Sequence, residues 1–211
     1  MIEKHAVFYR LILYSLVVVA VALLSSTLGL EIAWADSIMK NIPMSNIPAG
    51  VAFDPDNDCT YVTNADSNTV SVIDGSTNTV IKNIHVGSHP RGIAFDSNNG
   101  NLYVANEGSY TVSVIDGSTN TVIKNIPVGW SPLGVAFNPT NDNVYIASGT
   151  VYIIDGSTNT VIKNIPVGLQ PSRIVFDWNS GNVYVVNQFS NTVSVIDGST
   201  NTVIDTNPID K

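Results

Sequence analysis

Charged side chains are scarce in this sequence, and cysteine is nearly absent. Only 12% of the 211 residues are Asp, Glu, Lys or Arg, and the 17 acidic residues outnumber the 9 basic ones, for a net charge of -8. A nucleic-acid-binding surface needs a basic stripe, so this charge balance argues against that class of partner. The single cysteine, Cys59, excludes an internal disulfide framework. The 44% hydrophobic content excludes a polar disordered chain.

Residues that favour helices are also rare over most of the chain. Beyond residue 35 the only glutamate is Glu107 and the only leucines are Leu102, Leu133 and Leu169, whereas valine, isoleucine and threonine are abundant. Side chains branched at Cβ favour strands. We therefore expect the folded part to be all-β.

The first 35 residues have a composition of their own. Lys4 and Arg10 precede the uncharged apolar run 11–24, and Ala33-Trp34-Ala35 places small residues before a cleavage position at 35/36. This pattern is typical of a secretory signal peptide. An uncleaved membrane anchor is the alternative, because residues 11–30 carry no charge and are long enough to span a bilayer. Either interpretation places residues 36–211 outside the cytoplasm, secreted or at the cell surface.

The remainder of the chain is a tandem repeat. The string VSVIDGSTNTVIKNI stands at 70–84 and again, unchanged, at 112–126, and VSVIDGSTNTVI returns at 193–204. Its aspartate recurs four times, with spacings of 42, 39 and 42, at Asp74, Asp116, Asp155 and Asp197. The three missing residues of the third copy fall between Ser148 and Val151.

Each copy contains four short apolar runs separated by turn residues. In the second copy these runs are 92–95, 102–105, 111–115 and 121–128, divided by segments rich in Asn, Asp, Gly and Ser. Four antiparallel strands repeated about every 42 residues predict the blades of a β-propeller. The aromatic residues Phe53, Phe95, Phe137 and Phe176, and the tyrosines one strand later, are expected to pack between blades.

The repeat resembles a known family. Tyr61-Val62-Thr63-Asn64 is the YVTN signature itself, and it is echoed at 103–106 and 184–187 and accompanied by the VSVIDGSTNTVI block. The chain is therefore similar to the YVTN family of β-propeller repeats, and this resemblance implies a surface-layer or other cell-surface protein. It carries no indication of an activity, because propellers host many functions. The third copy departs from the signature with Tyr145-Ile146-Ala147-Ser148.

The domain boundaries follow from the repeat. We expect a signal peptide or anchor at 1–35 and a propeller at 36–211, with repeats at about 48–87, 90–129, 132–168 and 171–209. Residues 38–44 match the fourth-strand sequence VIKNIPV, and the last copy ends in a degraded version of it. This suggests ring closure in which the N-terminal strand completes the last blade beside 193–196. An open four-blade arc and a paired eight-blade ring remain as alternatives.

Candidate binding residues lie where the copies differ. The links between blades and the links between second and third strands are expected to share one face, and they carry most of the variation. The candidate binding face is His89, Arg91, Glu107, Tyr110, Trp130, Gln170, Arg173 and Phe189. Exposed aromatic side chains beside charged groups suit recognition, while neutral drift of solvated loops is the alternative.

Three features resemble metal-binding or catalytic motifs, but each has a simpler interpretation. The segment 54–58 has alternating carboxylates but lacks the glycine and glutamate of a calcium loop, so it predicts a hairpin turn. His85 and His89 have no evident third metal ligand, and Cys59 has no catalytic partner set. We expect neither a metal nor a cofactor.

Two functions from different classes follow. The first is an exported, non-catalytic propeller that serves as a structural or protein-binding module, with an envelope or surface protein, or a second copy of itself, as partner. The membrane enters only if residues 1–35 stay attached. The alternative is an extracellular enzyme resembling a lactonase or lyase. In that case Ala49, Arg91, Leu133, Ser172 and Arg173 would lie near a central tunnel, where two arginines without an acid or base favour anion binding over hydrolysis.

Overall fold

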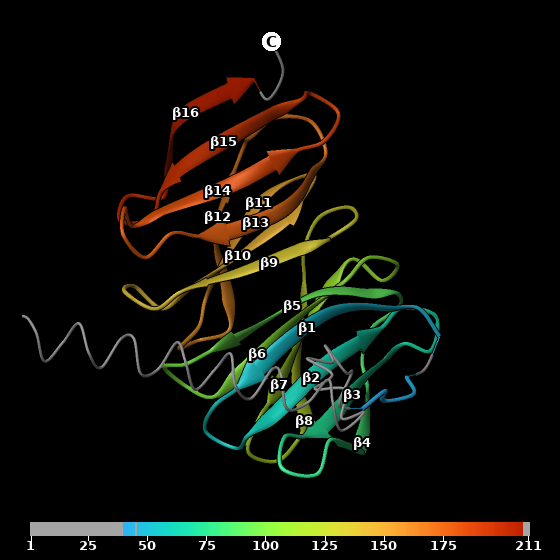
Figure 1. Ribbon diagram of the computed structural model, residues 1–211. Helices are drawn as coiled ribbons and strands as arrows, with labels where there is room; N and C mark the ends of the chain where they lie inside the picture. Colours follow the sequence, from blue (N-terminus) through green and yellow to red (C-terminus); the bar gives the residue numbers. More distant parts are fainter. Residues whose placement is uncertain (1–39, 45, 209–211) are drawn as a thin grey trace, which may run out of the picture. The chain divides into compact units, whose positions relative to one another are not determined.

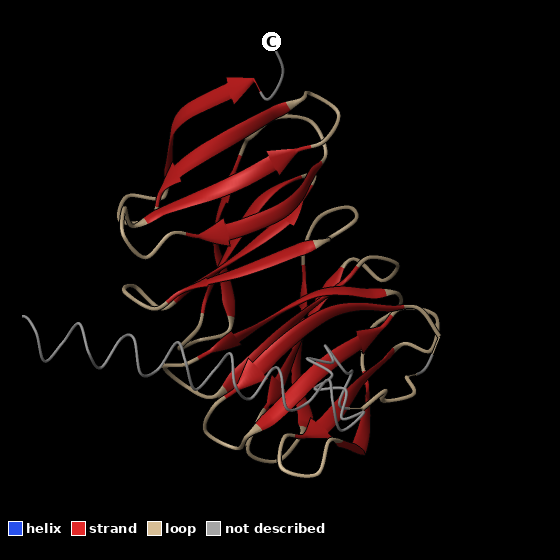
Figure 2. Ribbon diagram, in the orientation of Figure 1, coloured by secondary structure: helices blue, strands red, loops and turns tan. Residues whose placement is uncertain are grey.

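The computed structural model describes residues 40–44 and 46–208, so the expected signal peptide or anchor lies outside the described residues. Sixteen strands form four separate four-stranded antiparallel sheets, here called blades 1 to 4 (Figure 1). Figure 2 shows only strands and loops over the described part. Within that part, no helix has the length and apolar character that crossing a bilayer requires. The all-β, four-blade prediction is confirmed.

The strand order within each blade follows the chain. Blade 1 contains β1 (Pro48–Asp54), β2 (Cys59–Asn64), β3 (Thr69–Asp74) and β4 (Thr79–His85). Blade 2 contains β5 (Pro90–Asp96), β6 (Asn101–Asn106), β7 (Thr111–Asp116) and β8 (Thr121–Pro127). Blade 3 contains β9 (Gly134–Asn138), β10 (Asn143–Ser148), β11 (Thr150–Asp155) and β12 (Thr160–Ile165). Blade 4 contains β13 (Pro171–Phe176), β14 (Asn182–Asn187), β15 (Thr192–Asp197) and β16 (Thr202–Pro208).

The repeated DGSTN segment forms the turn between the third and fourth strands. In blade 2 the Asp116 carboxylate accepts hydrogen bonds from the N–H and hydroxyl of Ser118 and from the Thr119 N–H. These bonds, with the Ser118 hydroxyl first, lower the pKa of Asp116. Asn120 ends the turn at a φ of 54°, a left-handed conformation that asparagine adopts more readily than most residues.

The asparagine of the YVTN-like motif ties the second strand to the third. Asn106 Nδ2 donates to the hydroxyls of Thr111 and Ser113, at 3.1 and 2.9 Å. Asn64 and Asn187 make the same pair of bonds in blades 1 and 4. Blade 3 has Ser148 at this position. It therefore lacks the amide donor that fixes the link between the second and third strands in the other blades.

The hydrophobic core lies between consecutive blades. Blades 1 to 3 each present a buried tyrosine and other apolar side chains to the next blade, which contributes apolar residues of its own second strand. The main contributors are Tyr61, Val72, Leu102 and Val104 between blades 1 and 2, Tyr103, Val114, Val144 and Ile146 between blades 2 and 3, and Tyr145, Ile153, Val183 and Val185 between blades 3 and 4. Within the described part of the chain, no such cluster joins blade 4 to blade 1.

The expected role of the phenylalanines is confirmed for three of the four. Phe95, Phe137 and Phe176 pack in the clusters between blades. Phe53 is instead 51% exposed, so its expected packing between blades is wrong. The physical reason is that the described residues place no blade against its side of blade 1.

Neighbouring blades approach one another closely at a repeated glycine. A Cβ on Gly92 would lie 2.4 Å from the Leu133 carbonyl oxygen, and a Cβ on Gly50 would lie 2.3 Å from that of Arg91. Only a residue without a side chain fits against backbone at that distance. The equivalent position of blade 4 holds Arg173, whose side chain is exposed. The surface of blade 4 that faces away from blade 3 therefore differs from the surfaces by which blades 1 to 3 contact the next blade.

The expected closing strand is not formed. Residues 40–44 are not in a strand, and residues 38–39 lie outside the described residues. The place beside β15 is taken by β16, which pairs with it from Thr192↔Pro208 to Asp197↔Thr202. The last copy forms its own fourth strand. Pairing between strands uses the backbone, so it does not require the side chains of the repeat, which differ there. Completion of blade 4 by residues 38–44 is therefore wrong.

Candidate functional site

The links that vary between copies meet at one end of the blades. The Glu107 N–H donates to the His89 carbonyl oxygen at 3.0 Å, which joins the β6–β7 link to the link that enters blade 2. In blade 4 the Gln188 N–H donates to the Gln170 carbonyl oxygen in the same way. We call this set of links, residues 87–90, 107–110, 129–132, 148–150, 168–170 and 188–190, the loop face.

Five of the eight candidate residues line a single pocket of the loop face. This pocket, here called the loop-face pocket, has a volume of about 400 Å³ and is lined by His89, Arg91, Glu107, Gly108, Tyr110, Trp130 and Ser131. Blade 2, the link that enters it and the link that leaves it therefore supply the whole lining. The structure thus places these five residues around one pocket of the loop face.

An ion pair forms the polar part of the loop-face pocket. Arg91 Nε donates to Glu107 Oε2 at 2.7 Å, and both side chains are about one-third exposed, at 37% and 33%. Glu107 Oε1 accepts a longer hydrogen bond of 3.4 Å from the Ser131 hydroxyl. An exposed pair of this kind contributes at most about 1 kcal/mol to stability. The pair places a hydrogen-bond donor and a hydrogen-bond acceptor side by side in the pocket.

Two stacked aromatic rings form the apolar part. The ring centroids of Tyr110 and Trp130 lie 5.3 Å apart with an angle of 30° between the planes. Trp130 is nevertheless 76% exposed and Tyr110 43% exposed. The stack therefore presents aromatic surface to solvent instead of filling a blade interface.

The backbone of Tyr110 is strained. Its φ is 56°, whereas the equivalent positions of blades 1 and 4, Asn68 and Asn191, hold the residue type that tolerates this conformation. Asn68 also uses its side-chain oxygen to accept from the His89 N–H at 2.9 Å. Tyrosine in blade 2 has no such oxygen close to its backbone, because its hydroxyl lies at the far end of the ring. Strain of this kind is concentrated at functional sites in proteins.

The short link of blade 3 removes hydrogen bonds to the link that carries Trp130. In blade 4 the counterpart of Trp130, Leu169, receives a hydrogen bond from the Phe189 N–H and donates its own N–H to Ser190. The three residues missing from blade 3 are those that would make these bonds. What remains is a single contact from the Ser148 hydroxyl to the Trp130 carbonyl oxygen at 3.1 Å. Sequence comparison located this deletion, but not the ring stacking beside it.

The other three candidates lie apart from this pocket. Gln170 and Phe189 belong to the hydrogen-bonded links of blade 4, where Phe189 and Leu169 are 70% and 67% exposed. Arg173 instead lines a pocket of about 390 Å³ formed by the first strands of the blades, together with Ala49, Arg91 and Leu133. Ser172 is buried and is not part of that lining. The expectation of arginines without a nearby acid is wrong for Arg91, which pairs with Glu107.

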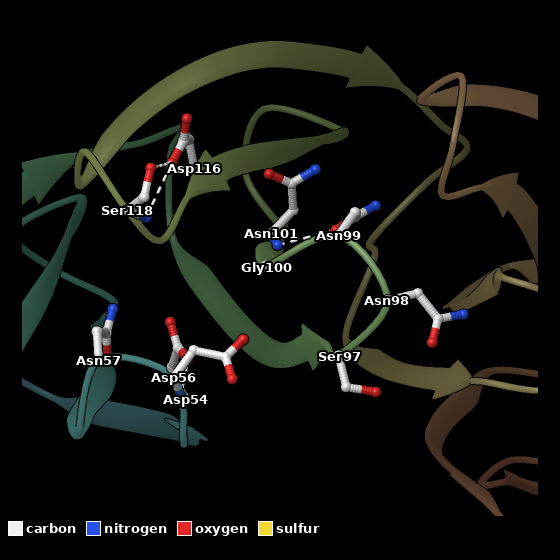
Figure 3. Close-up of a pocket in the computed structure, with 10 residues that line it drawn as sticks. All are labelled: Asp54, Asp56, Asn57, Ser97, Asn98, Asn99, Gly100, Asn101, Asp116 and Ser118. Carbon is white, nitrogen blue, oxygen red and sulfur yellow. Dashed lines mark hydrogen bonds between the residues drawn. The ribbon is translucent and has the colours of Figure 1, made fainter.

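A third pocket lies among the turns at the opposite ends of the strands. Its volume is about 440 Å³, and Figure 3 shows the carboxylates of Asp54 and Asp56 on one side and Ser97 and Asn98 on the other. Burial raises the pKa of Asp54, whose Oδ1 accepts from the Asp56 N–H at 2.9 Å. This bond belongs to the hairpin turn predicted for 54–58. Among the residues that the structure describes, no group of three or more His, Cys, Asp or Glu side chains is arranged to hold a metal ion.

Cys59 and His85 line none of these three pockets. The Cys59 thiol is buried and free, and burial followed by the charge of Asp74 raises its pKa. A raised pKa keeps the group in the thiol form, which is the less reactive one. Cys59 therefore lies in the environment of an unreactive thiol.

Comparison with known proteins identifies the fold and one family. The model of the choice-of-anchor I domain matches residues 74–210. Hydrazine synthase of Kuenenia stuttgartiensis is similar in structure, with a TM-score of 0.71 and 22% identity over 81% of this chain. The chain spans about half, 51%, of that protein. No curated protein matches the sequence. Because 1428 solved chains match, the structural likeness shows a widespread fold and no particular activity.

Proposed function

The chain belongs to the choice-of-anchor I domain family, and from this membership and the loop-face pocket we propose that it is a non-catalytic binding module of the cell surface. It engages a component of the cell envelope through the loop face. The partner that the sequence suggests is a protein of the envelope or a second copy of this chain.

The finer assignment to the YVTN type of repeat is part of this proposal. Its support is the signature at 61–64 and its echoes at 103–106 and 184–187, all of which form second strands of blades. The export signal read from residues 1–35 supports a location outside the cytoplasm.

The observation that carries the proposal is the Tyr110–Trp130 stack. Neither ring belongs to the hydrophobic clusters that join the blades. Tyr110 is held in a conformation that asparagine adopts with less strain, and Trp130 replaces Ser88 and Leu169 of the other links. Exposed aromatic side chains of this kind dominate many recognition surfaces.

The test is retention of the exported protein on isolated envelopes of the producing organism. We expect the variant carrying both Tyr110→Asn and Trp130→Leu to be released at least about tenfold more readily than the natural protein, which corresponds to the loss of one binding hot spot. Intact-mass analysis of the same material tests whether the chain begins at residue 36. Equal retention of natural protein and variant would contradict the role of the loop face.

A second candidate function rests on the pocket lined by the first strands. Arg91 and Arg173 both line it, which suits a substrate that carries an anionic group beside its lactone ring, and the enzyme alternative would act on such a substrate here. Hydrolysis of lactones by the natural protein, abolished by Arg173→Ala and unaffected by Trp130→Leu, would favour the enzyme over the binding module.

A further inference from the structure

The loop-face pocket combines an apolar ring surface with a charge-neutral polar pair. We infer that it binds a neutral pyranose sugar, so that the envelope component engaged by the loop face is a glycan. This inference rests on the proposed function and specifies the chemistry of its ligand.

The aromatic half suits one face of a sugar ring. Trp130 is 76% exposed while stacked on Tyr110 at 5.3 Å, so one face of the indole is covered and the other is open. An aromatic face carries partial negative charge and attracts the weakly positive hydrogens of C–H groups. A β-linked pyranose with equatorial hydroxyls directs its axial C–H groups to such a face.

The polar half suits the hydroxyl groups at the edge of the same ring. Arg91 donates only its Nε hydrogen to Glu107, which leaves the hydrogens of both terminal guanidinium nitrogens available. Glu107 Oε1 has only the 3.4 Å bond from Ser131 and accepts further hydrogen bonds. Two neighbouring hydroxyls match this arrangement, because one donates to the carboxylate while the other accepts from the guanidinium.

The charges favour a neutral ligand. Arg91 and Glu107 cancel within the pocket, and the chain as a whole carries a net charge of -8. An anionic ligand is repelled by the whole chain, and a cationic one competes with Arg91 for the single carboxylate of the pocket. A purely apolar protein segment would cover the ion pair and leave its remaining hydrogen-bonding groups without partners. A neutral polyhydroxylated ring with one apolar face avoids the repulsion of an anion and the competition of a cation. It also gives partners to the polar groups that an apolar ligand would leave unmatched.

The first test measures binding directly. The full exported chain is titrated with the neutral hexasaccharides cellohexaose, xylohexaose and mannohexaose by calorimetry. We expect millimolar or tighter binding of a β-linked hexasaccharide, weakened at least about tenfold by Trp130→Leu, since a contact of about 1.4 kcal/mol changes affinity tenfold. Leucine is the residue of the equivalent link in blade 4, so the variant keeps a side chain that the fold already accommodates.

Trp178 provides the matched control. It is 73% exposed, almost as much as Trp130, but it lies edge-on to Phe176 in the turn between β13 and β14. Trp178→Leu is expected to leave saccharide binding unchanged. Absence of binding for all three hexasaccharides up to about 10 mM, or equal losses in the two variants, would overturn the inference.

The second test separates failure of the inference from failure of the proposed function. Isolated envelopes are treated either with periodate, which cleaves the carbon bond between neighbouring hydroxyls of sugars, or with protease. Retention that depends on Trp130, survives protease and is lost after periodate supports a glycan. Retention lost after protease and kept after periodate overturns the glycan while leaving a protein partner and the proposed function standing. No retention on untreated envelopes contradicts the proposed function itself.

Discussion

The Tyr103 hydroxyl of blade 2 donates a hydrogen bond of 2.7 Å to Asn159 Oδ1 of blade 3. The ring is fully buried, and burial raises the pKa of the hydroxyl to about 12. This bond couples the second strand of one blade to the DGSTN turn of the next. Because removal of a buried hydrogen bond leaves its partner unsatisfied, we expect Tyr103→Phe to lower the free energy of unfolding by about 1–2 kcal/mol, measured by urea denaturation.

The fourth blade supplies the control for this substitution. Tyr184 occupies the same repeat position and is half-buried, and its hydroxyl makes no hydrogen bond to any residue that the structure describes. Tyr184→Phe is expected to change the unfolding free energy by less than about 0.5 kcal/mol. Equal effects of the two substitutions would show that the hydrogen bond between blades contributes nothing measurable.

Most of this fold follows from local sequence pattern. The 42-residue period, the alternating apolar residues and the DGSTN turns predict sixteen strands, because each depends on contacts within one blade. The exposure of Phe53 is not a property of one repeat, because it depends on which blades meet. The pairing of β16 with β15 lies within blade 4, but the degraded sequence of the fourth copy conceals it. Repeat similarity alone carries no information about the two ends of a series.

A second prediction concerns the pH dependence of stability at Asp96. This side chain is fully buried, its Oδ2 has no hydrogen-bond partner, and burial raises its pKa to about 6. A carboxyl whose pKa is higher in the folded than in the unfolded state binds its proton more tightly when folded, so stability falls as the pH rises between about 4 and about 6. Asp96→Asn is expected to flatten this decline. A shift of this size bounds the effect at about 3 kcal/mol.

Thermal unfolding of the natural protein and Asp96→Asn at pH values from 4 to 8 measures this effect. The substitution is tolerated in blade 3, where Asn138 holds the equivalent position. Asp177, the equivalent in blade 4, is the control of opposite sign, since its hydrogen bond from Ser180 lowers its pKa. Its stabilisation is therefore present above the unfolded-state pKa and lost as the pH falls. A parallel pH profile for both Asn variants would refute the assignment to Asp96.

The third prediction compares two substitutions at one repeat position. In Gly92→Ala the new methyl group meets the Leu133 carbonyl oxygen at 2.4 Å, and backbone cannot move away as a side chain does. We expect a loss of about 1–3 kcal/mol. Arg173→Ala in blade 4 removes an exposed side chain and is expected to cost less than about 0.5 kcal/mol. A comparable loss for Arg173→Ala would indicate that Arg173 has a packing role like that of Gly92.

The candidate site was predictable in its membership but not in its pairings. Differences between copies identified Arg91, Glu107, Tyr110 and Trp130, because the repeat supplies the background against which they stand out. The stacking of Tyr110 on Trp130 joins two links separated by a strand hairpin. Such contacts arise from tertiary placement of loops, for which the sequence has no periodic signal.

The last prediction uses the strain at Tyr110. Asparagine adopts a φ of 56° with less strain than tyrosine. It also provides a side-chain acceptor like the one that Asn68 offers to the His89 N–H. Tyr110→Asn is therefore expected to raise the free energy of unfolding by up to about 1 kcal/mol while weakening retention on the envelope. A substitution that stabilises the fold and reduces binding is the expected sign of a residue kept for function.

The reverse exchange in blade 1 is the matched control. Asn68→Tyr introduces the same strain at a φ of 55° and removes the acceptor of the 2.9 Å bond from His89. It is expected to lower the unfolding free energy by about 1–2 kcal/mol, since no tryptophan stands in the link beside it: the counterpart of Trp130 there is Ser88. If Tyr110→Asn instead destabilises the protein by several kcal/mol, the Tyr110–Trp130 stack belongs to the packing of the blades and the loop face loses its role in recognition.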